Sequence, residues 1–269
     1  MFELINKNGV SYFRSTVLKS KHCFSTRLGG FSTLDHTRGL NIAFGRGDDE
    51  ETVLKNIMAL EKAIELPSGR IISVPQIHGA EVRAVTMRDA GAGVYKKAEF
   101  ECDGYVTSDC GLPIGVKTAD CVPILLEGRD DEGNVVAVCA VHAGWRGTAS
   151  KIAKNAVEKL CSLGIRKENI YVAIGPCIDV CCYEVGADFT CEIENKLGQN
   201  YKNKFIKRNE NGYLYADLKG MNFEILTSFG VPKENIDVSE KCTCCDPELF
   251  YSHRGQKGKR GAMIGVILK

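Results

Sequence analysis

The chain has 269 residues, 13 of them cysteine, and its 35 basic and 34 acidic side chains give a formal net charge of +1. An odd cysteine count cannot pair completely within one chain, and a chain of this length buries a large core without disulfide staples. We therefore expect reduced thiols and a cytoplasmic protein, not a secreted disulfide scaffold. The balanced charge argues against broad electrostatic binding to nucleic acid or to an anionic membrane.

Neither export nor a membrane span is indicated. Residues 1–7 show no basic segment followed by a long apolar stretch. The most apolar run, Val135 to Trp145, is far shorter than the roughly 20 residues that cross a bilayer. No Pro/Gly/Ser-rich linker or charge block divides the chain. We expect one α/β domain over residues 1–269, as a monomer or small homo-oligomer.

Apolar residues recur at strand or helix spacing along most of the chain. In chain order the pattern predicts a strand at 11–18, a helix at 53–64, strands at 71–74, 81–86, 104–107, 114–118, 122–126 and 135–141, a helix at 152–163, a strand at 170–174, helices at 185–197 and 218–229, and a strand at 262–268. This mixture indicates an α/β or α+β fold with mixed sheets.

The predicted helix ends carry specific signals. Acidic residues 48–51 suit the start of the first helix, and Thr148 or Ser150 is the expected N-cap of the second. Glycines follow the last three helices and are expected to stop them. Residues 164–170 and 230–236 have similar sequences, which predicts one helix-to-strand connection used twice.

Three short segments place a histidine or cysteine at a predicted strand terminus. They contain His78, Cys121 and His142, each beside small residues. Two imidazoles and one thiolate suit zinc with an open fourth position, and copper is compatible with the same donors. The residues alone leave other interpretations open: hydrogen-bonded core histidines, a buried apolar cysteine, or a cysteine nucleophile with a histidine base.

The order of these segments resembles the laccase-domain family, also called multicopper polyphenol oxidase-like proteins or purine nucleoside phosphorylases of the laccase-domain type. The resemblance covers nearly the whole chain. Its most specific elements are Ala-Asp-Cys at 119–121 and His-Ala-Gly-Trp-Arg-Gly at 142–147. Further matching segments are 25–32, 40–41, 76–79, 103–104, 175–176, 181–186, 217–218, 242–243 and 250–254.

This resemblance implies that His78, Cys121 and His142 bind zinc. It also implies a sandwich of mixed sheets with outer helices, similar to a cysteine-dependent toxin deamidase. Family members are described as purine nucleoside phosphorylases that deaminate adenosine and cleave methylthioadenosine. Other family assignments are copper-dependent phenol oxidation and removal of serine from a peptidoglycan precursor.

The histidine count ranks these activities. A laccase needs several coppers, and the five histidines of this chain leave no second histidine-rich cluster beside His22, His36 and His253. Zinc lowers the pKa of bound water to about 7, which suits both purine deamination and amide hydrolysis. We therefore expect a zinc enzyme acting on purine nucleosides, with the amidase as the alternative. A further alternative is a non-enzymatic interaction protein stabilised by the metal, in which a fourth protein ligand would occupy the open coordination position.

Phosphorolysis also requires a phosphate site. Arg27, Arg146 and Arg254 are the expected phosphate ligands, because guanidinium groups bind phosphate through two hydrogen bonds. Each arginine could equally pair with a surface carboxylate. Asn41 is a candidate for sugar or phosphate contact, or a turn cap.

Other polar residues near the triad have two interpretations each. Asp120 is expected to carry a proton or to support Cys121, unless it only caps a turn. Gln76 is expected to orient the base or the metal water, unless it is an ordinary strand-end amide. Trp145 could stack on a purine or fill the core. Tyr183 and Glu184 are expected to hold their loop.

The sequence assigns no chemical role to the other twelve cysteines. Cys181-Cys182 and the run from Cys242 to Cys245 look like metal ligands, but the resemblance implies no second metal cluster there. Residues 258–260 depart from the Gly-Arg usual in the family, so no role is assigned to Arg260.

Overall fold

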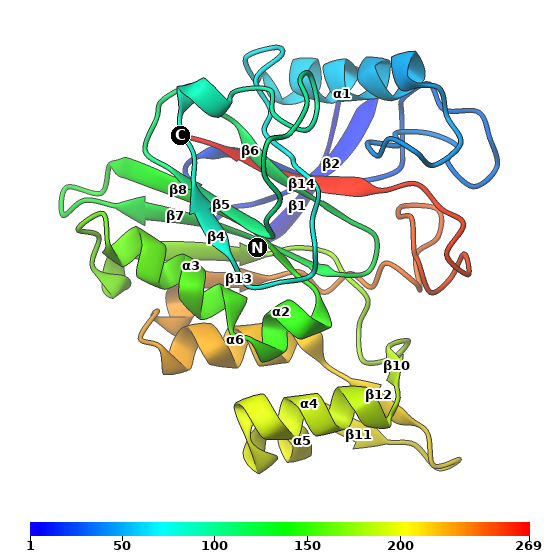
Figure 1. Cartoon of the computed structure of the whole chain (residues 1–269), viewed down its shortest axis with the longest axis vertical. Coiled ribbons are helices and arrows are strands. Elements are labelled where there is room, and N and C mark those ends of the chain that lie inside the picture. The colour runs from blue at the N-terminus through cyan, green and yellow to red at the C-terminus, as the bar shows by residue number, and fades with distance from the viewer.

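The computed structural model describes residues 1–269 and shows two stacked β-sheets between outer helices (Figure 1). The first sheet is antiparallel, in the order β1 (Phe2–Lys7), β2 (Val10–Ser15), β3 (Lys21–Ser25), β14 (Met263–Leu268), β6 (Ile114–Thr118). The second is mixed, in the order β13 (Ile236–Val238), β9 (Ile170–Ile174), β7 (Val122–Arg129), β8 (Val135–Ala143), β5 (Gly104–Thr107), β4 (Val82–Ala84). The expected sandwich of mixed sheets with outer helices is confirmed.

Alternation along the strands explains the layers. In β7, Leu125 packs between the two sheets, whereas Ile124 and Leu126 face the opposite way. That opposite face is covered by α3 (Ile152–Cys161) and α6 (Leu218–Ser228). Because both faces of the second sheet are buried, its central strands consist of nearly continuous apolar residues.

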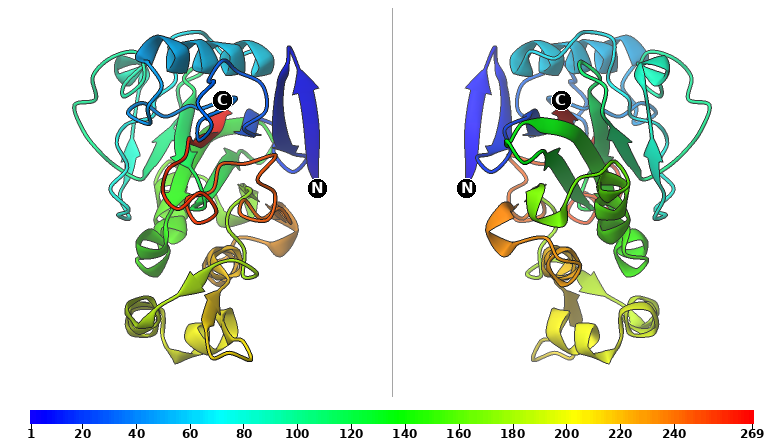
Figure 2. Two further views of the ribbon diagram at one scale, coloured as in Figure 1. Left: turned by 90° about the vertical axis from the view of Figure 1, so that its right-hand side faces the viewer. Right: turned by 90° about the vertical axis from the view of Figure 1, so that its left-hand side faces the viewer.

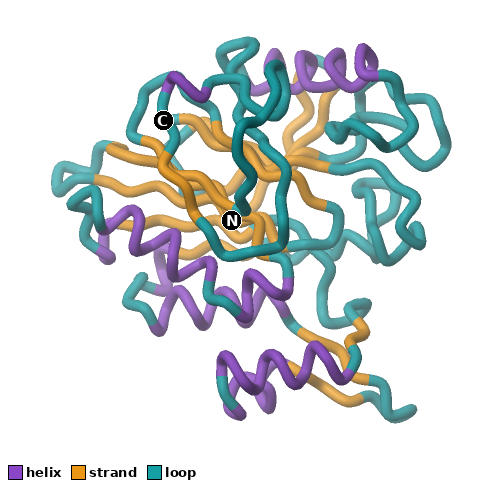
Figure 3. Tube along the Cα trace, in the orientation of Figure 1, coloured by secondary structure: helices purple, strands orange, loops and turns teal.

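The outer face of the first sheet is covered by α1 (Glu50–Ile64). Its apolar stripe includes Val53, Ile57 and Leu60, all fully buried. Asp49 caps the helix by accepting a hydrogen bond from the Thr52 amide at 2.7 Å, as the acidic start predicts. Helices thus lie on both outer sides with the strands between them (Figure 3).

A smaller unit projects from one side of the sandwich (Figures 1 and 2). It consists of α4 (Ala187–Leu197), α5 (Gln199–Phe205) and a three-stranded sheet of β10 (Glu184–Val185), β12 (Leu214–Ala216) and β11 (Ile206–Arg208). These short strands and α5 have too few residues for a clear apolar period, and the sequence did not predict them.

No helix in the structure combines the length and apolarity that a membrane crossing demands.

The twice-used connection is confirmed. Short 3₁₀ helices, Lys167–Asn169 and Lys233–Asn235, lead into β9 and β13, which pair in parallel. The predicted strand at 71–74 is wrong, since only one isolated bridge joins Ile72 to Ile114.

The second helix also begins differently from the prediction. It is split into α2 (Trp145–Ala149) and α3, and Lys151 in the left-handed region (φ 60°) occupies the N-cap of α3. Neither predicted N-cap is correct: Ser150 is the C-cap of α2, and Thr148 is fully buried, where its hydroxyl accepts a hydrogen bond from Asn222 at 2.9 Å.

Candidate metal centre

The register of three neighbouring strands gathers the predicted ligands at one end of the second sheet. His142 lies near the end of β8 opposite Pro123 of β7, so Cys121 stands just before the paired segment. Asp103 immediately precedes β5, where Gly104 pairs with Val141. His78 reaches the same place from the loop before β4. The antiparallel ladder therefore brings together residues that are far apart in the sequence.

The triad geometry suits a single metal ion. One ligand atom from each of His78, Cys121 and His142 lies within 4.8 Å of the others. The two imidazole rings are 4.9 Å apart between centroids and nearly perpendicular, at 83°. Three donors leave a position for water or substrate, as in catalytic zinc sites.

Two of the six non-glycine residues with positive φ lie at this site. His78 and Asp120, the residue before Cys121, both have positive φ, +59° and +93°. Such conformations are costly for residues other than glycine, and they cluster at functional sites. The surrounding hydrogen bonds must hold these two residues in place.

Asp103 provides much of that holding. Its fully buried carboxylate accepts hydrogen bonds from the amides of residues 77, 78 and 79 at 3.2, 2.9 and 2.7 Å. It is also 2.8 Å from Nδ1 of His142. This contact places the Nδ1 proton on the Asp103 side, so Nε2 is the ring nitrogen that would bind a metal. Sequence reasoning missed this role; the available signal was an acid directly before a buried strand.

Gly144 leaves room for the three ligands. A Cβ at this position would lie 3.0 Å from Cδ2 of His78 and 3.5 Å from both Sγ of Cys121 and Cε1 of His142. A side chain would therefore crowd the donors, which explains a glycine between His142 and α2.

Electrostatics favour the metal-binding form of Cys121. Burial alone would raise the pKa of its thiol, but His142 and His78 lower it to about 6. Burial would lower the pKa of His142, whereas Cys121 and Asp103 raise it to about 9. Burial likewise opposes ionisation of Asp103, yet hydrogen bonds, above all from His142, lower its pKa. In the metal-free protein a Cys121 thiolate thus faces a protonated His142, and a metal ion bound at Nε2 would displace that proton.

In metal-free protein, we expect alkylation of Cys121 to follow thiolate formation with a midpoint near pH 6. An unperturbed cysteine would give about 8.5. The sign follows from the lowered pKa: reactivity is present above the midpoint and lost as the pH falls through it. Mass spectrometry of the Cys121 peptide measures the midpoint, and His142→Gln should raise it. A midpoint near 8.5 in the unmutated chain would contradict the proposed charge state.

The triad opens into a cavity of about 880 Å³. Its wall includes the apolar or aromatic residues Pro75, Phe44, Val94 and Tyr95. Its charged lining residues are one acid and five bases: Glu50, Arg46, Lys96, Lys97, Lys117 and Arg260. This imbalance favours an anionic ligand.

Of the other predicted site residues, Gln76 lines the cavity. Its amide is occupied by the Lys117 backbone, accepting from the N–H and donating to the carbonyl, both at 2.8 Å. Asp120 is buried behind Cys121, where its two oxygens accept hydrogen bonds from the Thr243 hydroxyl and the Arg254 amide, both at 2.6 Å. The catalytic roles of Gln76 and Asp120 stay predictions.

Arg27 and Asn41 are engaged elsewhere in the fold. The Arg27 guanidinium donates to the carbonyls of Pro247 and Arg38. The fully buried Asn41 side chain accepts from the amides of Ala43 and Ala262, both at 3.0 Å, so it ties together two segments of the cavity wall.

Arg146 and Arg254 also lie outside the cavity lining. Exposed Arg146 stacks on Trp145, with its guanidinium carbon 4.2 Å from the ring centroid, and Trp145 itself packs on Phe189. Arg254 donates to the carbonyls of Cys182 and Glu184. Substrate roles for the four predicted residues Arg27, Asn41, Arg146 and Arg254 stay predictions that the cavity lining does not favour.

Arg260 and Lys117 were not assigned a role from the sequence, yet both line the cavity. The Nε of Arg260 is buried without a hydrogen-bond partner. Lys117 donates from Nζ to the Ser73 carbonyl at 2.8 Å, and burial lowers the pKa of Lys117 to about 8. Arg260 received no role because residues 258–260 differ from the Gly-Arg usual in the family. Lys117 and Arg260 are also far apart in the sequence, so no local pattern indicates that they line the same cavity.

The chain is similar to known proteins over most of its length. The family model described as multi-copper polyphenol oxidoreductase laccase matches residues 21–269. Purine nucleoside phosphorylase YlmD from Geobacillus stearothermophilus is 35% identical over 231 residues, 85% of this chain and 82% of the relative. Adenosine deaminase RL5, from an unknown prokaryotic organism, is 34% identical over 86% of this chain and 87% of its own length.

Solved structures show the same fold. The hypothetical protein YfiH of Bacillus licheniformis superposes with a TM-score of 0.89 at 29% identity, over 99% of this chain and 98% of that one. YlmD from Geobacillus stearothermophilus superposes with a TM-score of 0.87 at 32% identity, over 96% of each chain. The chain belongs to the family described as multi-copper polyphenol oxidoreductase laccase.

Proposed function

We propose that the protein is a zinc-dependent purine nucleoside phosphorylase that also deaminates adenosine and cleaves methylthioadenosine. The observation that carries this proposal is the open His78–Cys121–His142 triad at a large, basic cavity. The printed names of relatives, purine nucleoside phosphorylase and adenosine deaminase, support it.

The residues present fit zinc. Two imidazoles and a thiolate of lowered pKa are zinc ligands, and Asp103 orients one imidazole from behind, as carboxylates do in zinc proteins. A bound zinc ion would act as a Lewis acid and lower the pKa of water to about 7. The triad has three donors, so its geometry favours an open site over a metal closed by a fourth protein ligand.

The cavity is lined by residues suited to a purine base and to phosphate. Phe44 and Tyr95 present aromatic side chains suited to a purine base. Arg260 and Lys117 both line the cavity, and their positive charges are suited to phosphate. A phosphate dianion would favour the charged form of Lys117, whose pKa of about 8 otherwise leaves it partly neutral in mildly alkaline solution.

The remaining histidines do not favour a multicopper oxidase. His22 is buried between Ser15 and Ser20, hydrogen-bonded at 2.9 and 2.8 Å. His36 contacts the Arg46 carbonyl, and His253 is exposed. None of them joins the triad, so the donor set supports one mononuclear centre. Amide hydrolysis would use that same centre and is an outcome of the test below.

The test is turnover by zinc-loaded protein. Adenosine with water should yield inosine and ammonia. Inosine with phosphate should yield hypoxanthine and ribose 1-phosphate, and methylthioadenosine with phosphate should yield adenine and methylthioribose 1-phosphate. Arg260→Gln should raise the KM for phosphate about tenfold, the scale of one charge-assisted hydrogen bond, and impair phosphorolysis more than deamination. Release of serine from a muramoyl-serine nucleotide, without nucleoside turnover, would replace this proposal by the amidase.

A further inference from the structure

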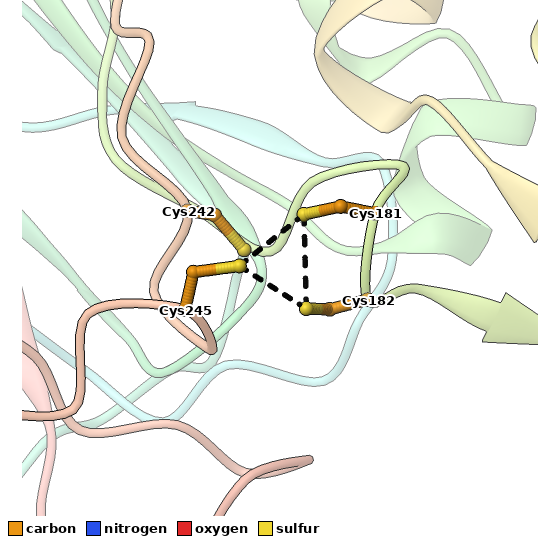
Figure 4. A group of neighbouring side chains, drawn as sticks. All are labelled: Cys181, Cys182, Cys242 and Cys245. Carbon is orange, nitrogen blue, oxygen red and sulfur yellow. Dashed lines mark hydrogen bonds between the residues drawn. The ribbon is translucent and has the colours of Figure 1, made fainter.

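Four cysteines outside the triad converge from two loops. Cys181 and Cys182 lie between β9 and β10, and Cys242 and Cys245 follow β13. Their sulfur atoms all lie within 4.8 Å of one another. Figure 4 shows the four side chains pointing toward one another from two neighbouring loops. Convergence of four thiols from segments some 60 residues apart needs a chemical explanation.

The spacing of the sulfurs matches one tetrahedral ion. Cys245 Sγ is 3.4 Å from Sγ of both Cys181 and Cys182, and these two are 3.7 Å apart. A disulfide requires about 2.05 Å. Sulfurs around a tetrahedral zinc, with Zn–S bonds of about 2.3 Å, lie about 3.8 Å apart. An iron–sulfur cluster would need more widely separated cysteines, because they must surround several irons.

Hydrogen bonds from Lys219 and Asp179 hold both loops in place. The buried Lys219 ammonium donates to the Asp179 carboxylate at 2.7 Å and to the carbonyls of Ser239 and Lys241 at 2.8 and 3.0 Å. The Asp179 amide donates to Sγ of Cys242 at 3.4 Å. This cation and this N–H···S bond would offset the negative charge of a four-thiolate site.

We propose that Cys181, Cys182, Cys242 and Cys245 bind one zinc ion in a closed structural site, separate from the triad. Four thiolates in tetrahedral spacing are the donor set typical of structural zinc. Cys181 and Cys245 are exposed, which gives the ion a route of entry. The site goes beyond the proposed enzymatic function and does not depend on it.

The proposed site acts on the triad through Asp120. Thr243, inside the Cys242–Cys245 loop, donates to one oxygen of Asp120 at 2.6 Å. Arg254 donates its amide to the other oxygen and its guanidinium to the Cys182 carbonyl. Zinc would therefore fix both loops that hold Asp120 behind Cys121, and would also fasten the root of the projecting α4–α5 unit.

The test measures the zinc content of the unmutated chain and of three variants, all purified under reducing conditions. The unmutated chain and Cys244→Ser should hold about two zinc ions each, whereas Cys245→Ser and Cys121→Ser should each hold about one. Cys244 is the matched control, because it lies in the same loop but outside the group of four. Equal zinc content in Cys245→Ser and Cys244→Ser would overturn the proposal.

A second measurement does not depend on the folding of Cys245→Ser. In Cys121→Ser loaded with cobalt, four thiolates should give intense sulfur-to-cobalt charge-transfer absorption. In the unmutated zinc-loaded chain, the peptides carrying the four cysteines should resist alkylation until a chelator is added. Weak cobalt absorption, free alkylation before chelation, or disulfides among the four cysteines in anaerobically prepared protein would each count against the site.

Discussion

Cys121→Ala is expected to lose the metal of the triad and to lower kcat/KM for adenosine by about 10³-fold or more. The thiolate is the only anionic donor among the three ligands, and its charge offsets that of the ion. A metal ion contributes several kcal/mol of transition-state stabilisation, and each 1.36 kcal/mol is about tenfold in rate. Metal analysis and nucleoside turnover on the same preparation measure both effects.

Cys110→Ala is the control for this experiment, because Cys110 is exposed and lies outside both metal groups. It should keep the metal content and the activity of the unmutated chain. If Cys121→Ala retains full metal stoichiometry, the assignment of Cys121 as a ligand is wrong. If it loses metal but keeps turnover, the metal is structural and the proposed function fails.

Asp103→Asn should lower the metal affinity of the triad and the stability of the fold. The substitution keeps the shape of a fully buried side chain but removes the charge that faces His142 and three backbone amides. Loss of such a supporting carboxylate lowers metal affinity about 10–100-fold. Buried backbone amides that lose their acceptor lower the free energy of unfolding by about 1–3 kcal/mol, and by more where the acceptor was charged. Metal competition and urea unfolding measure the two quantities.

The exposed Asp131, which pairs with Arg166 at 2.6 Å, provides a matched control. Asp131→Asn should change stability by less than about 1 kcal/mol, because exposed ion pairs contribute little. An Asp103→Asn protein with unchanged metal affinity would show that His142 needs no orienting partner. Unchanged stability would show that another group satisfies the three amides.

Strands with long apolar runs were predictable because the apolar residues of the strand itself indicate that it is buried. The predicted bounds of β5, β6 and β9 agree with the structure, and β7 and β8 begin where predicted. The metal triad was also accessible, since a His or Cys beside small residues at a strand end is a local signal, strengthened by the resemblance. What sequence reasoning could not supply was the register that places these ends together.

The cavity wall was beyond local reasoning for a physical reason. Lys117 and Arg260 come from distant segments, and their side chains converge only after β6 and β14 pair. Conversely, Arg27 and Asn41 lie in segments that match the family, yet their side chains form hydrogen bonds with backbone groups. A motif identifies residues that matter, but only the fold distinguishes ligand contacts from structural ones.

The placement of β14 has a consequence for synthesis on the ribosome. This strand lies between β3 and β6 in the first sheet, although roughly 145 residues separate it from β6 along the chain. At about 5–20 residues per second, the neighbouring strand edges stay unpaired for roughly 7–30 s during translation. Unpaired edges invite association with other chains. The nascent protein therefore passes through an aggregation-prone interval, which ends when the segment carrying Arg260 and β14 emerges.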